Sequence, residues 1–499
     1  MSLRLFHRLD TAKTQYYHFK AIIVAGMGLF TDAYHLFCVP PIMSLLGHVY
    51  YKSNGYQISP AVESSTLAVA LLGTVIGQLI FGRLGDLVGR RRLYGLALML
   101  MMAGSFGCGF SMGATRGCVL ASLGFFRFVL GVGIGGDYPL SATMMSECAN
   151  KRMRGVFMAA VFSMQGLGIL ASSAVTMAVC KIFGRIYPSS PKDPTPKEAD
   201  MAWRLILILG VIPAVITFYW RMMIPETARY TALVEKNVLQ ATRDMERVLD
   251  MSDGQIAEGH PLQPSQSSYP LFSKQFFLRH GRNLLACSAG WFLLDIVFYS
   301  STLFQSKIYH KYLHEEHAGK AVTAFEAAFE VASLQAIVAC YSLIPGYIAA
   351  IFLIDHVGQL SLQAIGFVFM AIIYFSIGVP YDIYWKSHTD KLFMFLYGLT
   401  FFFANCGPNT TTFILPAELF PARFRTTCHG IAGAVGKVGA IIGAVGFLMA
   451  SQDDDQNGYE KALGMRVTLI ILGGIWVLGM AVTNLFTKET KGTSLEENE

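Results

Sequence analysis

Apolar blocks of about 20 residues recur along the whole chain, with short polar segments between them. A helix of about 20 apolar residues crosses the hydrocarbon core of a bilayer, which is about 30 Å thick. Because a soluble core could not hide so much apolar surface in a chain of 499 residues, the blocks predict an all-α membrane protein. The expected spans, about twelve in number, lie near residues 20–46, 61–82, 92–112, 118–142, 156–180, 203–224, 283–305, 334–355, 361–381, 392–415, 427–450 and 466–487.

A long polar stretch over residues 225–282 divides these blocks into two equal sets. Its prolines and a Gln/Ser run at 263–268 predict a linker, with one amphipathic helix near 228–250. An equal division of this kind is typical of two parallel bundles, each built from nested repeats. The predicted units are an N-terminal six-helix bundle over 1–224, the linker over 225–282, a C-terminal six-helix bundle over 283–487 and a tail over 488–499.

The charge of the chain indicates orientation in a membrane rather than nucleic-acid binding. Only 14% of the residues are charged and 53% are hydrophobic, whereas about a quarter of the residues are charged in soluble domains. The formal net charge is +6, and many basic residues, such as Arg91 and Arg152, lie in short loops between spans. The positive-inside rule therefore places these loops, the linker and both termini in the cytoplasm. The expected partner is the lipid bilayer, not nucleic acid.

Residues that could form a catalytic or metal site are not grouped in this sequence. The nine cysteines show no metal-ligand or disulfide spacing, and most lie in or beside apolar blocks, where they pack as small apolar side chains. No nucleophile and base stand in a catalytic pattern. We therefore expect no enzyme activity and no bound metal or cofactor.

The loop over residues 82–92 reads GRLGDLVGRRR and resembles the loop motif of the major facilitator superfamily. Asp86 can meet a helix N-terminus and pair with a neighbouring arginine such as Arg90, which would latch one conformation of a transport cycle. Glu147, near the end of the fourth span, is a further candidate partner for the loop arginines. The matching loop of the second half, residues 355–359, keeps Asp and Gly but lacks the arginines, so a weaker latch is expected there.

Ionisable residues inside spans are costly unless they are paired or hydrated, so each is a candidate for function. The first span carries Asp32 and His35, three residues apart and therefore on one helical face. The fourth span carries Arg127 and Asp137. The glycines at 131, 133, 135 and 136 are expected to let a neighbouring helix approach, and the pair at 135–136 is expected to open the helix locally. Arg127 is a natural counter-ion for either Asp32 or Asp137, and spacing alone does not choose between them.

Polar groups of the second half predict a site for an oxyanion that carries a proton. Trp291, Asp295 and Tyr299 in the seventh span follow one another at i, i+4 and i+8 and so share one helical stripe. The Trp and Tyr can donate hydrogen bonds to an oxyanion, whereas Asp295 accepts only from a protonated one, which favours H2PO4⁻ over sulfate. Asn409, beside a helix-breaking proline, and the lone cation Lys437 in the eleventh span extend this polar set.

Residues 135–147, GGDYPLSATMMSE, resemble the signature of the phosphate:proton symporters of plants and fungi. The resemblance covers nearly the whole chain and is strongest to the high-affinity plasma-membrane members of plants. It implies a major facilitator fold with a substrate site between the two halves. It further implies that phosphate is held by Tyr138, Gln165, Trp291, Asp295, Tyr299 and Asn409, with Lys437 nearby, and that Asp32, Arg127 and Asp137 relay protons.

His35 departs from this family, which usually has aspartate at the corresponding position. Replacing a carboxylate by an imidazole changes the charge of the site by about one unit. We therefore predict that His35 takes part in proton coupling and alters the pH dependence or the coupling of transport. The alternative is that His35 only packs and donates one hydrogen bond.

Together these patterns predict a proton-coupled symporter that imports inorganic phosphate by alternating access across the plasma membrane, with homo-oligomer formation left open. One alternative is a sensor that binds phosphate with little transport. Another is a sugar or organic-solute carrier, which would share the loop motif and the Pro-Glu-Thr sequence at 225–227.

Overall fold

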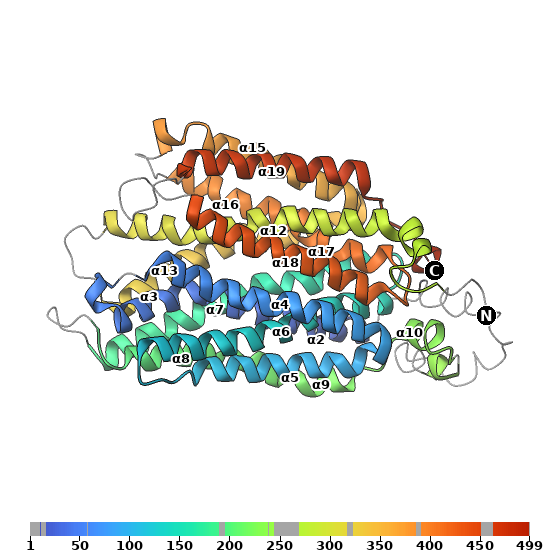
Figure 1. The fold of residues 1–499 in the computed structure, drawn as a ribbon, viewed down its shortest axis with the longest axis horizontal. Coiled ribbons are helices and arrows are strands. Elements are labelled where there is room, and N and C mark those ends of the chain that lie inside the picture. The colour runs from blue at the N-terminus through green and yellow to red at the C-terminus, as the bar shows by residue number, and fades with distance from the viewer. Residues whose placement is uncertain are drawn as a thin grey trace.

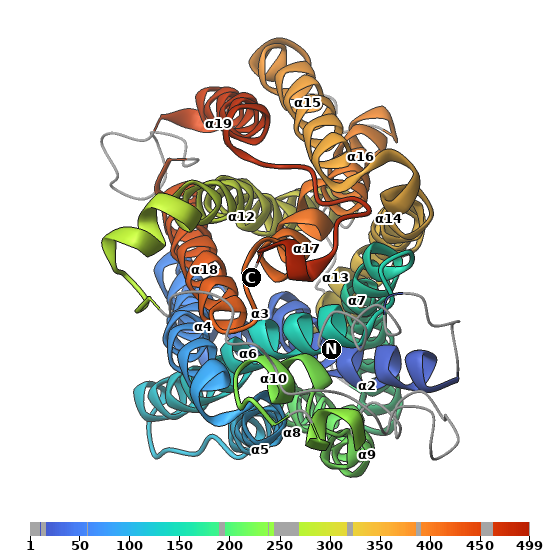
Figure 2. The same ribbon diagram turned by 90° about the vertical axis from the view of Figure 1, so that its right-hand side faces the viewer.

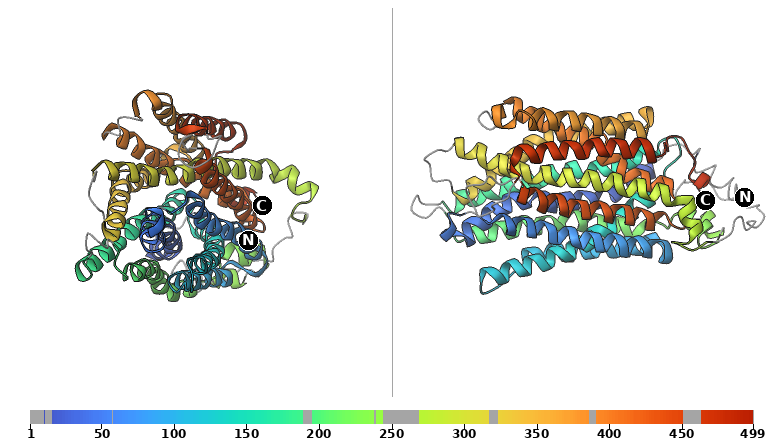
Figure 3. Two further views of the ribbon diagram at one scale, coloured as in Figure 1. Left: turned by 60° about the vertical axis from the view of Figure 1, so that its left-hand side comes forward. Right: turned by 45° about the horizontal axis from the view of Figure 1, so that its top comes forward.

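The computed structural model describes residues 10, 16–56, 58–188, 195–237, 239–243, 269–316, 323–385, 391–450 and 463–498. Every regular element within these ranges is a helix, as the apolar blocks predicted. The long helices run side by side along the long axis of the molecule (Figures 1 and 3). The described chain is therefore an all-α bundle of membrane-length helices.

The first half begins with a span made of two helices, α2 (Tyr16–Phe37) and α3 (Val39–Tyr50). They meet at Cys38, because Pro40 and Pro41 lack the N–H groups that would continue the hydrogen-bond ladder. The sixth span is likewise divided, at Gly210, into α8 (Ala199–Leu209) and α9 (Val211–Met223). The remaining elements of this half are η1 (Lys52–Asn54), α4 (Pro60–Val88), α5 (Arg90–Gly109), α6 (Arg116–Cys148) and α7 (Arg154–Ile186).

The second half begins with α12 (Lys274–Glu316), which starts inside the segment that the sequence predicted as linker. A π-helical turn at Ala339–Leu343 joins α13 (Ala324–Val338) to α14 (Ile344–Val357), so these helices form one span. The remaining elements are α15 (Gln359–Gly378), η3 (Tyr381–Trp385), α16 (Lys391–Cys406), α17 (Pro408–Leu419), α18 (Arg425–Ala450), α19 (Gly464–Phe486) and η4 (Leu495–Asn498).

Within the described ranges, 11 segments are long and apolar enough to cross a membrane. The expected tenth span, 392–415, is divided at Gly407 into helices of 16 and 12 residues, each shorter than one membrane crossing. Pro408 causes this division, because it begins α17 and has no N–H with which to continue the ladder of α16. α16 and α17 together make the twelfth crossing.

The glycines between residues 131 and 136 allow a neighbouring helix to approach, as predicted, but the pair at 135–136 does not open α6, contrary to the prediction. α6 continues through this pair, with Pro139 inside the helix. Gly131 and Gly135 instead lie against the backbone of α4, where a Cβ atom would overlap carbonyl oxygens. The glycines therefore serve close backbone packing of two helices, which is a common use of small residues in membranes.

Seen end-on, α2 to α9 form one group of helices and α12 to α19 form a second group beside it (Figure 2). The two groups meet along two lines, because α4 packs against α18, and α7 packs against α13 and α14. We call this boundary the seam. The short helix α10 (Ala228–Leu233) and residues 487–498 lie at one common end of the bundle, called the tail end below (Figure 1). The amphipathic helix expected near 228–250 is not continuous: α10 ends at Leu233, residues 234–237 are not helical, and residues 238 and 244–250 lie outside the described ranges.

Candidate functional site

A cavity at the seam is lined by every residue that was predicted to hold phosphate. α6 and α7 contribute from the first half, and α12, α17 and α18 contribute from the second. The predicted residues are Tyr138, Gln165, Trp291, Asp295, Tyr299, Asn409 and Lys437. Asp32 of α2 and Tyr347 of α14 line the same cavity. The fold thus brings together polar side chains from spans that are far apart in the sequence.

Lys437 forms a buried ion pair with Asp295 in this cavity. Its Nζ lies 3.0 Å from Asp295 Oδ2 and 3.2 Å from the Tyr299 hydroxyl oxygen. The Lys437 and Asp295 side chains are only 6% and 3% exposed. α18 can approach α12 closely because Gly436 leaves room for the Trp291 ring. Asp295 of the seventh span is therefore paired with Lys437 of the eleventh span. Spacing within one helix could not reveal this pairing.

Tyr138 connects the seam cavity to Asp32. Its hydroxyl accepts a hydrogen bond of 2.7 Å from Gln165 Nε2 and donates one of 2.8 Å to Asp32 Oδ2. Asp137 precedes Tyr138 directly, so the helix turns the two side chains in different directions. One side chain therefore contacts both a predicted phosphate ligand and a predicted proton carrier.

The amide of Asn409 has a fixed orientation. Asn405 donates from Nδ2 to the carbonyl of Phe401 at 2.8 Å, so its Oδ1 accepts from Asn409 Nδ2 at 2.7 Å. Because a backbone carbonyl can only accept, the direction of this chain of hydrogen bonds cannot be reversed. Asn409 Nδ2 also lies 3.4 Å from the Tyr347 hydroxyl. Neither Asn405 nor Tyr347 was among the predicted site residues, although Asn405 lies only four residues before Asn409, on the other side of the break at Gly407.

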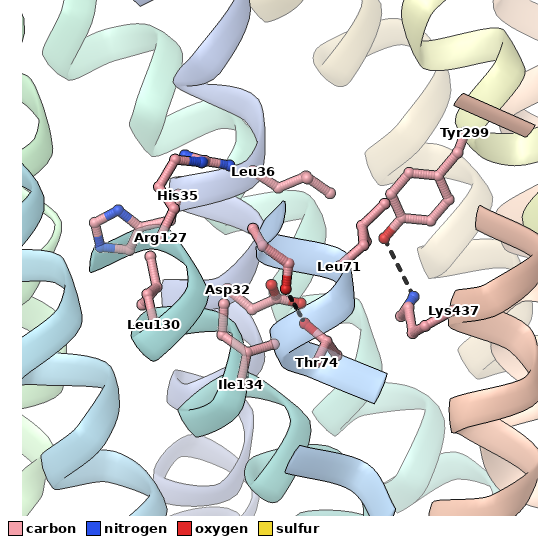
Figure 4. Close-up of a pocket in the computed structure, with 11 residues that line it drawn as sticks. Asp32, His35, Leu36, Leu71, Thr74, Arg127, Leu130, Ile134, Tyr299 and Lys437 are labelled. Atoms are coloured by element: carbon pink, nitrogen blue, oxygen red, sulfur yellow. Dashed lines mark hydrogen bonds between the residues drawn. The ribbon is translucent and has the colours of Figure 1, made fainter. Parts of the chain in front are cut away.

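A second cavity extends from Asp32 into the first half of the bundle (Figure 4). Asp32, Tyr299 and Lys437 line both cavities, whereas His35 and Arg127 lie on the far side of the second one from Tyr299 and Lys437 (Figure 4). Each cavity has a volume of about 20 Å³, which is room for about one water molecule. A tetrahedral oxyanion needs more space, so this conformation is closed around the site.

The expected ion pair of Arg127 with Asp32 or Asp137 is not formed. Arg127 donates from Nε to the carbonyl of Thr66 at 3.0 Å. Asp137 instead pairs with Arg221 of α9, and both side chains are at most 1% exposed. The sequence prediction missed Arg221 because it lies near the end of the sixth span, where a basic residue usually marks the membrane edge.

His35 lies at a contact between helices rather than beside the Asp32 carboxylate (Figure 4). Its Nε2 is 2.6 Å from the Ser105 hydroxyl on α5, and its ring meets the Tyr34 ring edge-on at 5.4 Å. A Cβ atom at Gly210 would lie 2.6 Å from the imidazole, so the α8–α9 junction covers it as well. His35 thus lines the same cavity as Asp32, but its Nε2 is hydrogen-bonded to Ser105 and holds α2 against α5.

Asp86 contacts the start of α18 across the seam. Its Oδ2 accepts hydrogen bonds of 2.7 Å from both the N–H and the hydroxyl of Thr427, and its Oδ1 accepts one of 3.3 Å from the N–H of Thr426. A carboxylate at this position satisfies free N–H groups and interacts favourably with the helix dipole. The expected contact of Asp86 with a helix N-terminus is therefore present, and that helix belongs to the opposite half.

Glu147 joins arginines from the two halves. Its Oε1 lies 3.2 Å from Arg90 Nη2 and 2.7 Å from Arg425 Nη1, and all three side chains are fully buried. Arg90 also pairs with Asp86 at 3.3 Å, and the Thr227 hydroxyl donates to Glu147 Oε2. We call Asp86, Arg90, Glu147 and Arg425 the seam cluster. Together they hold the halves in contact at the tail end.

The second half contributes a matching but smaller contact. Asp355 of α14 accepts a hydrogen bond of 3.4 Å from the N–H of Val156 at the start of α7. Asp355 makes one long hydrogen bond, whereas Asp86 makes several hydrogen bonds and an ion pair. The second latch is therefore weaker than the first, as its lack of arginines predicted. Glu489 of the tail caps α15, accepting from the N–H groups of Gln359 and Leu360 at 3.1 and 3.2 Å.

Ion pairs at the tail end join α10 of the linker to the C-terminal tail and to Asp10 of the N-terminal segment. Arg229 of α10 lies 2.8 Å from Glu496 and 2.8 Å from Asp10, and Arg154 lies 3.2 Å from Asp10. Burial raises the pKa of Glu496, but the Arg229 guanidinium and the Ser494 hydroxyl outweigh burial and hold that pKa at about 2. Glu496 is therefore ionised at any physiological pH, and its ion pair persists.

A sequence profile of the family described as "Sugar (and other) transporter" matches residues 21–499. The chain belongs to this family. Within it, the chain is 58% identical to the probable inorganic phosphate transporter 1-8 of Arabidopsis thaliana, over 100% of this chain and 95% of that protein. It is also 58% identical to the probable inorganic phosphate transporter 1-10 of Oryza sativa subsp. japonica, over 98% and 91% of the two chains. The low affinity inorganic phosphate transporter 3 of Petunia hybrida is 48% identical, over 99% and 94%.

Solved structures of other transporters share the fold. The proton:xylose symporter XylE bound to 6-bromo-6-deoxy-D-glucose superposes with a TM-score of 0.73 at 20% identity, over 97% of this chain and 98% of that one. The human organic anion transporter MFSD10 gives a TM-score of 0.61 at 14% identity, over 94% and 100%. The chain therefore has the major facilitator fold, with two six-helix bundles, and belongs among the transporters named for inorganic phosphate.

Proposed function

We propose that the protein is a symporter that imports inorganic phosphate together with protons. The observation that carries the proposal is the place of Tyr138, whose hydroxyl lies between Gln165 of the seam cavity and the carboxylate of Asp32. A change in the protonation of Asp32 must therefore change the hydrogen bonding of a cavity residue. The names of the related plant transporters support phosphate as the substrate.

The seam cavity offers hydrogen-bond donors and one acceptor that match H2PO4⁻. Trp291, Tyr299 and Gln165 can donate to phosphate oxygens, while Asp295 can accept from a P–OH group. Lys437 balances the charge of Asp295 at 3.0 Å, so the anion enters a site whose two nearest fixed charges cancel. An oxyanion without a proton, such as sulfate, would leave Asp295 facing it without a hydrogen bond.

Protonation of Asp32 is the coupling step in this proposal. Ionised Asp32 accepts the hydroxyl hydrogen of Tyr138. When Asp32 takes up a proton, the cavity loses one negative charge and the Tyr138 hydroxyl becomes free to donate to phosphate, so both effects favour entry of the anion. Uptake against a negative interior requires more protons than phosphate charges, because moving one charge costs about 2.3 kcal/mol per 100 mV.

The tail end faces the cytoplasm of a plasma membrane in this proposal, and the basic short loops support that orientation. The seam cluster closes the tail end while the opposite end admits phosphate. Separation of Asp86 and Glu147 from α18 then opens the tail end and releases phosphate inside. The transport cycle is thus a rocking of the two halves about the site.

Reconstitution into liposomes tests the proposal. With an acidic exterior and a negative interior, labelled phosphate should accumulate, and collapse of the proton gradient should abolish accumulation while leaving exchange of phosphate for phosphate. Excess xylose or glucose should not compete, which separates this protein from a sugar carrier. Saturable phosphate binding without accumulation or exchange would instead identify a sensor, and accumulation that ignores the proton gradient would contradict symport.

A further inference from the structure

A buried ion pair inside the first half lies close to Asp32. Asp137 Oδ1 contacts Arg221 Nη1, and both side chains are at most 1% exposed. Arg221 Nη2 donates to the carbonyl of Val24 on α2 at 3.4 Å, and the guanidinium lies 3.8 Å from the centre of the Tyr94 ring on α5. From its place on α9, this single arginine therefore contacts α2, α5 and α6.

Gly28 provides the space for the ion pair. A Cβ atom at Gly28 would overlap Asp137 Oδ2 and lie 2.7 Å from Arg221 Nη2. The carboxylate and the guanidinium therefore rest directly on the backbone of α2. Asp32 follows Gly28 at i+4, so it lies one turn further along the same face of α2. The ion pair thus fixes α6 against α2 one helical turn from the hydrogen bond between Tyr138 and Asp32.

Asp137 and Asp32 differ in partner and in access. Asp137 is in direct contact with a guanidinium, which does not lose its proton in proteins. Neutralising Asp137 would leave Arg221 as an uncompensated buried cation, so the ionised pair is strongly favoured. Asp32 accepts its hydrogen bond from the neutral Tyr138 and lines both the seam cavity and the second cavity. Only Asp32 combines a neutral partner with a place on both cavities.

We propose that Arg221 is a positioning residue: by holding ionised Asp137 against α2, it sets the spacing at which Tyr138 donates to Asp32. Asp32 then exchanges the proton during transport, while Asp137 stays paired throughout. This inference rests on the proposed phosphate:proton symport. It revises the predicted relay, in which Asp137 and Arg127 shared the proton with Asp32.

The pair can be removed without replacing any residue that lines the two cavities. The titratable and charged residues of that lining come from every element packed around Asp32: Tyr138 of α6, Asp295 and Tyr299 of α12, Tyr347 of α14, Lys437 of α18, His35 of α2 and Arg127 of α6. A change in pH dependence after mutation of the pair would therefore come from the pair itself.

The decisive experiment compares single and double neutralisation in liposomes. Arg221→Gln leaves a buried carboxylate without its cation and should lower uptake at least tenfold, whereas Asp137→Asn/Arg221→Gln removes both charges and should stay within about threefold of wild type. Because no ion pair then holds α6 against α2, the double variant should still respond to a proton gradient but with a shifted pH profile, and Arg221→Lys should partly restore both uptake and the wild-type profile. An unchanged pH profile in the double variant would contradict the positioning role. If the double variant instead lost its response to a proton gradient but kept phosphate exchange, Asp137 would be the proton carrier and the inference would be overturned.

Glycine variants supply a second test that does not depend on charge. Gly28→Ala should displace the ion pair and shift the pH profile, because its Cβ atom enters the space of Asp137. Gly124→Ala, on α6 with nothing near its Cβ position, is the matched control and should behave as wild type. Unchanged profiles in both variants would contradict the positioning role. Failure of wild-type protein to couple phosphate to protons would instead refute the proposed function itself.

Discussion

Neutralising Glu147 should release the tail end of the seam. Glu147→Gln leaves the charges of Arg90 and Arg425 buried, and both side chains are fully inaccessible to solvent. Loss of one partner from a buried ion pair costs about 3–5 kcal/mol, and the lower value applies because Arg90 keeps Asp86 as a partner. About 3 kcal/mol corresponds to a shift of roughly 100-fold toward conformations that are open at the tail end.

Alkylation of Cys428 measures this shift. Cys428 is buried directly after Thr427, which contacts Asp86 across the seam, so opening of the tail end exposes its thiol. In a variant that keeps only this cysteine, Glu147→Gln should raise the alkylation rate by up to about 100-fold. Asp382→Asn is the control, because its ion pair with Arg466 is half exposed and lies within the second half. Equal alkylation rates in wild type and Glu147→Gln would refute the reasoning.

Three further substitutions probe the site. Tyr138→Phe removes the hydroxyl between Gln165 and Asp32, so stimulation of uptake by an acidic exterior should be lost while the protein stays folded. Retained stimulation would show that Tyr138 has no part in proton coupling. Asp295→Asn removes the acceptor for P–OH and the counter-charge of Lys437, so uptake should fall about tenfold or more and normal uptake would exclude Asp295 from the site. His35→Asp should change the pH profile of uptake, whereas profiles that coincide would leave His35 with a packing role only.

The helices and the lining of the seam cavity could be predicted from the sequence, because a bilayer restricts both the backbone structures that can cross it and the polar side chains that they can carry. Uninterrupted apolar blocks have few structures open to them in a bilayer. A side chain such as Asp295 or Lys437 is costly there, so its presence marks a place where the fold supplies a partner or water. The same rule marked Asp32 and Asp137.

The partners of these residues could not be predicted, because they depend on how helices from different parts of the chain pack. Lys437 was identified as a lone cation, yet its counter-ion lies on another helix of the second half. Arg127 was predicted as a counter-ion for Asp32 or Asp137, but Asp137 forms its ion pair with Arg221 of α9. The glycines before Asp137 predicted both close packing and a local opening of the helix, and only the close packing is present, because the packing of α4 decides between them. In each case the missing information was tertiary.

Simultaneous measurement of phosphate and proton fluxes in Asp32→Asn liposomes tests the central claim most directly. Wild-type protein should carry protons inward with phosphate, and Asp32→Asn should keep exchange of phosphate for phosphate with no accompanying proton flux. Proton flux coupled to phosphate in Asp32→Asn, at the wild-type ratio, would contradict the account, because the proton would then be carried by another group.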